Sequence, residues 1–228
     1  MQNLFLMRSN VMKKIVICAA LFAAATSLLS ALDFAVGARA AFGLGVGTDV
    51  KMDDTDLNLG KTMDVDGLVF GKLWFTENII LQAELGTTAH KVGMTTKGEE
   101  LATSGSDSRD ASGYLTFDTL DVPLLVGYDI PLGDSFSLTP FFGPQVSFVL
   151  GKAESGGDFS GTFKPKSPVL FDVVFGASAA YNLGPGAIVG DVRYNLGLIP
   201  LTVKDSGDDL FTPRALLFGL GYQLKFEK

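Results

Sequence analysis

Residues 34–46, FAVGARAAFGLGV, alternate strictly between two kinds of side chain. Every even position in this stretch is apolar, whereas the odd positions are alanine or glycine apart from Arg39. Successive side chains of a β-strand point to opposite faces, so this period of two predicts a strand with one apolar and one small, polar face. An amphipathic helix would instead repeat its apolar residues every three or four positions.

The same alternation recurs along the chain and predicts a set of eight strands. It is least regular around 65–75, because placing Lys72 on the polar face puts Phe70 and Trp74 there as well. A bulge, or a rim position for Trp74, would resolve the conflict, and the register of this strand stays open. The other six segments lie around 79–86, 119–130, 136–150, 171–181, 188–198 and 216–226.

The connections between these segments alternate between long and short. The short ones fall around 76–78, 131–135 and 182–186, and the long ones around 48–62, 88–112, 152–168 and 199–213. Strands joined alternately by tight turns and long loops are typical of an up-and-down barrel. We therefore expect an all-β, eight-stranded antiparallel barrel with both chain ends on the short-turn side.

The bulk of the apolar face decides which side of the barrel faces outward. A soluble barrel of the lipocalin type, which binds its ligand inside, has an apolar interior, whereas a membrane barrel reverses the order. The apolar face is rich in phenylalanine, tyrosine and leucine, and an eight-stranded interior is too narrow to hold so many large side chains. This favours a transmembrane β-barrel, with the lipocalin-like barrel as the alternative.

Charged residues follow the same division. The predicted outward positions carry charge only at Asp118 and Arg214, both near the loop-side ends of strands. Charges buried in a narrow interior are tolerable when they are paired, so we expect a network of four basic and four acidic side chains in the lumen. Its members are Arg39, Lys72, Glu84, Asp121, Asp172, Asp191, Arg193 and Lys225.

The first thirty-one residues read as a secretory signal peptide. Lys13 and Lys14 precede an apolar run at 15–29 that ends in small residues, although an N-terminal membrane anchor is an alternative. We expect a signal peptide over 1–31 and one barrel domain over 32–228. Met1, Met7 and Met12 all remain possible starts, and the exact cleavage site stays open.

Removing this segment leaves an acidic chain without cysteine. It takes away Arg8, Lys13, Lys14 and Cys18, so the basic residues fall from 18 to 15 against 25 acidic residues, a formal charge of -10. Such a balance argues against a surface for nucleic acid.

Three runs resemble the outer-membrane β-barrel domain family of small porin-like proteins, which includes OmpA- and OmpX-like eight-stranded barrels. They are LDVPLL at 120–125, PFFGP at 140–144 and DVRYNLGL at 191–198. The last strand also resembles the assembly signal of such proteins through Gly221, Leu224 and Phe226, although the chain ends in Glu227-Lys228 rather than an aromatic residue. The resemblance implies a bacterial outer membrane and contacts with its lipid and the barrel-insertion machinery. It also implies possible extracellular ligands bound through the loops.

Candidates for chemistry are few, and we expect no catalytic residue, cofactor or metal. His90, the only histidine, is predicted at the mouth of a strand or in the following loop, where it is solvated. Nearby Ser104, Ser106, Ser108 and Asp107 have no fixed geometry. The cluster Asp49, Asp53, Asp54 and Asp56 lacks the glycine and glutamate of a calcium loop.

Long loops on one side of a membrane barrel favour a non-enzymatic protein of the envelope or of surface contact. A narrow porin-like channel for small solutes is the alternative. A lipid-processing enzyme that uses His90 at the lumen rim is a further one.

Overall fold

The computed structural model describes residues 33–45, 57–96, 111–158, 161–163, 167–202 and 209–226. The predicted signal peptide, the aspartates at 49–56 and the serines at 104–108 lie outside these ranges.

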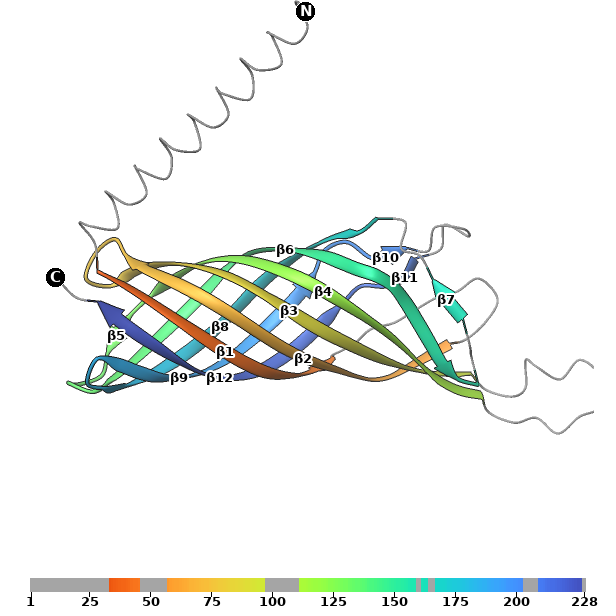
Figure 1. Cartoon of the computed structure of the whole chain (residues 1–228), viewed down its shortest axis with the longest axis horizontal. Helices are drawn as coiled ribbons and strands as arrows, with labels where there is room; N and C mark the ends of the chain where they lie inside the picture. The colour runs from red at the N-terminus through yellow and green to blue at the C-terminus, as the bar shows by residue number, and fades with distance from the viewer. Residues whose placement is uncertain are drawn as a thin grey trace, which may run out of the picture.

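Eight long strands close into one antiparallel barrel (Figure 1). Their circuit is β4-β3-β2-β1-β12-β9-β8-β6, and pairing of β6 with β4 completes it, which confirms the predicted fold class. The long strands are β1 (Phe34–Gly45), β2 (Leu57–Trp74), β3 (Ile79–Thr96), β4 (Ala111–Tyr128), β6 (Phe136–Gly157), β8 (Val169–Leu183), β9 (Gly186–Gly197) and β12 (Arg214–Phe226). The short ones are β5 (Ile130–Pro131), β7 (Gly161–Phe163), β10 (Leu201–Thr202) and β11 (Asp209–Phe211).

Both ends of the barrel wall lie on the tight-turn side, as predicted. Phe34 of β1 pairs with Phe226 of β12, and their rings stack with centroids 4.7 Å apart. Gly133 and Gly184 have φ values of 95° and 70°, a left-handed conformation that suits glycine, in two of the turns at this end. None of the described segments forms a helix long and apolar enough to cross a membrane.

The barrel is apolar outside and charged inside. Phe142 and Leu220 on the outer face are 64% and 66% exposed, whereas Arg39 and Asp191 on the inner face are 5% and 6% exposed. This is the membrane arrangement, so the lipocalin-like alternative is wrong.

The register of β2 is regular along most of the strand. Lys72 and Phe70 both point inward and are buried, and the register shifts only between Leu59 and Thr62. Gly37 on the neighbouring strand makes room for the Phe70 ring, since a Cβ there would lie 2.4 Å from Phe70 Cζ. At the turn-side rim, Trp74 Nε1 donates to Asp129 Oδ2 at 3.2 Å, so Trp74 has the rim position that was one of the two expected solutions.

Four adjacent strands reach further toward the loop side than expected. β2, β3 and β4 have 18 residues each and β6 has 22, whereas the other long strands have 12 to 15. The predicted starts near 65 and 119 and the predicted ends near 86 and 150 are therefore wrong. On β3 and β6 the outer face carries charges beyond these points, at Lys91 and Lys152, so the alternation that marks a strand disappears from the sequence there.

Candidate functional site

A buried ion network occupies the centre of the lumen. Arg39 on β1 donates from Nη1 to both carboxylate oxygens of Asp191 on β9, at 3.0 and 2.7 Å, and from Nη2 to Asp66 on β2. Arg193 donates from Nε to Asp191 at 2.8 Å and from its two terminal nitrogens to Glu84 on β3, at 2.8 and 3.2 Å. Two guanidiniums and three carboxylates thus form one connected cluster.

This network joins opposite walls of the barrel. β3, which carries Glu84, and β9, which carries Arg193, are separated by three strands in either direction around the circuit. A direct bond between them therefore crosses the full width of the lumen.

Local sequence places these groups. Asp191 and Arg193 are two residues apart on β9 and so share the inner face. Gly219 on β12 leaves the space that the cluster fills, because a Cβ there would lie 2.2 Å from Asp191 Oδ1 and 2.9 Å from Arg39 Nη1. The absence of a side chain at Gly219 thus gives the Arg39–Asp191 pair its space.

Apolar side chains fill the lumen next to the network. Leu125, Phe141 and Val174 form a buried cluster, and the Arg193 guanidinium lies 5.3 Å from the centroid of the Phe141 ring. A second cluster is formed by Ala180, Ala187 and Val189.

Lys72 and Lys225, both expected in the charge network, lie toward the turn end, where each ammonium group is near an aromatic ring. Lys72 Nζ is 5.4 Å from the centroid of the Phe70 ring, and Lys225 Nζ is 5.1 Å from that of Trp74.

The loop-side half of the lumen holds a separate acidic chamber of about 30 Å³. Asp121 accepts a hydrogen bond from Thr88 Oγ1 at 2.5 Å. Asp172 accepts bonds from Ser147 Oγ at 3.2 Å and from Gln145 Nε2 at 3.3 Å. These two carboxylates, expected in one network with the arginines, are thus held by hydroxyl and amide donors.

The expected balance of four bases and four acids is wrong. Asp64 and Asp66 on β2 also face the interior, where they are 4% and 7% exposed, and they make the lumen acidic. Both share the even parity of Lys72, so Asp66, inside the predicted strand 65–75, follows from the alternation itself, and Asp64 follows when the strand is extended toward the loop side.

His90 lies on β3 and points into this chamber, so the expected solvated loop position is wrong. Its Nδ1 is 2.8 Å from Asp64 Oδ1, its Nε2 is 3.1 Å from Thr119 Oγ1, and its ring stacks on Phe117 at 4.6 Å. Asp64, His90 and Thr119 thus form a chain of acid, imidazole and hydroxyl, the arrangement that activates a nucleophile in some enzymes. However, Thr119 is 1% exposed, and a chamber of about 30 Å³ has room for water but not for an acyl substrate.

Within the described ranges, no group of three or more histidine, cysteine, aspartate or glutamate side chains is placed to hold a metal ion.

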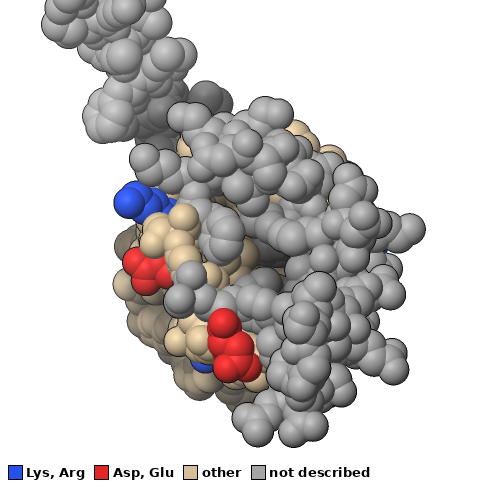
Figure 2. Space-filling model, turned by 90° about the vertical axis from the view of Figure 1, so that its right-hand side faces the viewer, with Lys and Arg blue, Asp and Glu red and all other residues tan. Residues whose placement is uncertain are grey.

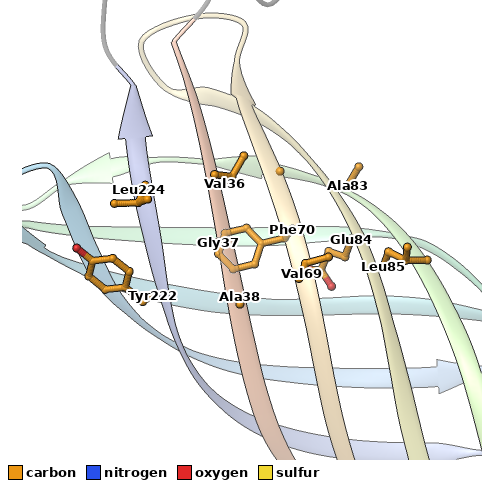
Figure 3. Close-up of a pocket in the computed structure, with 11 residues that line it drawn as sticks. Val36, Gly37, Ala38, Val69, Phe70, Ala83, Glu84, Leu85, Tyr222 and Leu224 are labelled. Atoms are coloured by element: carbon orange, nitrogen blue, oxygen red, sulfur yellow. The ribbon is translucent and has the colours of Figure 1, made fainter. Parts of the chain in front are cut away.

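A shallow depression of about 690 Å³ marks the outer wall over β12, β1, β2 and β3 (Figure 3). Small residues such as Ala38, Gly71 and Ala83 lie in it, and Leu85 and Tyr222 stand at its sides. It belongs to the apolar surface that faces lipid.

The loop end of the barrel is viewed in Figure 2, where both acidic and basic side chains lie on the described part of the rim. Lys91 on β3 and Glu154 on β6 are exposed on the outer face of this extended wall. Lys91 Nζ lies 4.5 Å from the centroid of the Tyr114 ring on β4.

One family model and several solved structures are similar to this chain. The family model described as outer membrane protein beta-barrel domain matches residues 24–203. Neisserial surface protein A is similar at 14% identity over 85% of this chain and 97% of that chain, with a TM-score of 0.48. A major outer membrane protein from Thermus thermophilus is similar at 15% identity over 84% and 99%, with a TM-score of 0.43.

The attachment invasion locus protein Ail of Yersinia pestis is similar at 13% identity over 86% of this chain and 99% of that chain, with a TM-score of 0.40. No curated protein sequence matches the chain.

Proposed function

This chain belongs to the outer membrane protein β-barrel domain family, and we propose that it acts without catalysis, as a closed anchor that presents its loop-side wall to partners outside the cell. It is an integral protein of a bacterial outer membrane, since the family and the exposed apolar belt agree on that location. The proposal concerns what the barrel does there.

The bond between opposite walls carries this proposal. Arg193 and Glu84 meet across the lumen at 2.8 Å, and Phe141 packs against the same guanidinium. Solute passing through the barrel would have to break a buried ion pair, so the lumen is suited to stability rather than to transport.

The extended strands support the surface role. A strand of 18 residues is about 60 Å long, and at a tilt of about 45° it rises about 42 Å, against an apolar band of about 25 Å. The wall of β2, β3, β4 and β6 therefore projects from the membrane on one side of the barrel. Its outer face carries Lys91, Tyr114 and Glu154, which suit polar contacts.

Conductance in planar lipid bilayers tests the closed lumen. We expect no stable single-channel current from the wild-type barrel at neutral pH. Reproducible current that changes in size in Arg193→Met would overturn the closed-anchor proposal and establish the narrow porin-like channel. The acidic chamber favours cation selectivity for such a channel, so reversal potentials in a salt gradient would identify it.

Labelling of intact cells tests the projecting wall. The chain's one cysteine, Cys18, lies in the predicted signal peptide, so in the processed chain Lys152→Cys is a unique thiol on the exposed part of β6. We expect a membrane-impermeant maleimide to label it, and the matched variant Asp134→Cys, in a tight turn, to react only after lysis. The reverse pattern would place the extended wall inside the cell.

Incubation with phospholipid and lipopolysaccharide tests the absence of catalysis. We expect no released acyl chains above the level of the His90→Ala variant. Hydrolysis that this substitution abolishes would make the barrel an enzyme.

A further inference from the structure

The acidic chamber contains oxygen atoms that lack a donor. Asp121 is 6% exposed, and its Oδ1 has no hydrogen-bond partner although Oδ2 is bonded to Thr88. The side-chain Oδ1 of Asn195, which lines the same chamber, is also buried and unpartnered. Both atoms are acceptors, and buried acceptors are normally satisfied, so a cation or a hydrogen-bond donor is needed in the chamber.

The charges around the chamber are also unbalanced. Asp64, Asp121 and Asp172 line it, and His90, bonded to Asp64, is the basic group that faces them. Arg214 also contributes to the lining, but its side chain is exposed and shares the outward parity of Phe218. Buried carboxylates without compensating charge are costly, so something positive is needed beside Asp121 and Asp172.

Neighbouring strands bring these two carboxylates together. Asp121 on β4 stands opposite Ser147 on β6, and Ser147 donates to Asp172 on β8. Asn195 on β9 stands opposite Val174 on β8, and Val174 is two residues from Asp172 on the same inner face. The oxygens of four adjacent strands thus converge on one space.

We propose that this chamber binds one hard divalent cation, with Asp121, Asp172 and Asn195 as oxygen ligands and water completing the shell. Carboxylate, amide and water oxygens are what Ca²⁺ and Mg²⁺ prefer. A volume of about 30 Å³ admits an ion with one or two water molecules. The site has two carboxylates rather than three acidic or histidine ligands, which agrees with the finding on metal groups within the described ranges.

Direct binding to the refolded full-length barrel tests the proposal. The protein, folded in zwitterionic detergent and stripped with EDTA, is titrated calorimetrically with Ca²⁺ and separately with Mg²⁺. To remove the separate aspartate cluster of the first loop, the titration is done in a background of Asp49, Asp53, Asp54 and Asp56→Asn. We expect one saturable site per barrel for at least one of the two ions.

Matched variants assign the site to the chamber. Asp121→Asn should weaken the affinity at least tenfold, whereas Asp118→Asn, exposed on the outer face of the same strand, should leave it unchanged. If Asp121→Asn does not fold, Asp172→Asn and Asn195→Ala carry the same expectation. Folding of each is checked by the shift in gel migration between unheated and boiled samples.

Three results would overturn the proposal. One is no saturable binding of either ion at millimolar concentration. Another is binding that every folded chamber variant retains at wild-type strength. The third is a melting temperature that rises on acidification and is the same in EDTA and in Ca²⁺ or Mg²⁺, which would show that protons compensate the carboxylates.

Discussion

Replacing Arg193 by methionine should lower the free energy of unfolding more than replacing any charged residue on the outer face does. The change removes three hydrogen bonds at 2.8, 2.8 and 3.2 Å and leaves Glu84, whose side chain is 0% exposed, without its cation. Removing one partner of a buried pair costs about 3–5 kcal/mol, because the remaining charge stays buried and uncompensated. We therefore expect the free energy of unfolding to fall by about that amount.

The sole tryptophan reports this change. Trp74 lies at the turn-side rim, bonded to Asp129, so its fluorescence should change when the barrel unfolds in urea from lipid vesicles. The control is Lys152→Met on the exposed part of β6, for which we expect a change within about 0.5 kcal/mol.

The double variant Glu84→Gln with Arg193→Met separates ionic coupling from lost packing. With both charges gone, the total cost should be smaller than the sum of the two single costs by about 2 kcal/mol. A loss below about 1 kcal/mol in Arg193→Met, or strictly additive single costs, would refute the role of this pair in holding the opposite walls.

Three further substitutions, with one control, test other parts of the barrel. Gly219→Ala should destabilise it by about 1–3 kcal/mol through overpacking, measured as a lower temperature for the gel-migration shift. Gly190→Ala is the control, because its new Cβ would lie 3.9 Å from its nearest neighbour, and it should change the stability little. Equal losses of stability in the two variants would show that lack of space at Gly219 is not the cause. Phe142→Arg should cost about 2–4 kcal/mol at mid-membrane, seen as reduced folding into vesicles; unchanged folding would place Phe142 outside the band. Phe226→Ala should reduce assembly in cells more than spontaneous folding in detergent, and equal losses would show that the predicted assembly signal is only structural.

The sequence predicts the wall better than the contents of the lumen. Strict alternation, as at Phe42 or Leu220, identifies strands and outward faces wherever lipid imposes an apolar face. Around Lys91 the outer face is polar while Val92 on the inner face is apolar, so the pattern of an apolar outer face is lost. For this reason His90 is predicted only at the mouth of a strand or in the following loop.

The odd or even position of a residue predicts that its side chain faces the lumen, but it does not predict which group that side chain contacts. Asp191 and Asp121 look alike in sequence, yet Asp191 meets two arginines and Asp121 accepts a bond from the hydroxyl of Thr88. Which partner each carboxylate meets depends on the stagger of the strands around the barrel. It also depends on glycines such as Gly219, whose effect appears only when the barrel is closed.

The ion network also bears on the order of events during biogenesis. Arg39 and Asp191 are 152 residues apart, and Glu84 and Arg193 are 109 apart, so neither pair exists until β1 and β3 have come together with β9. A half-curled sheet in the bilayer would expose these charges to hydrocarbon, which is costly. Insertion and seam closure are therefore expected to occur together, with open intermediates kept at the aqueous interface.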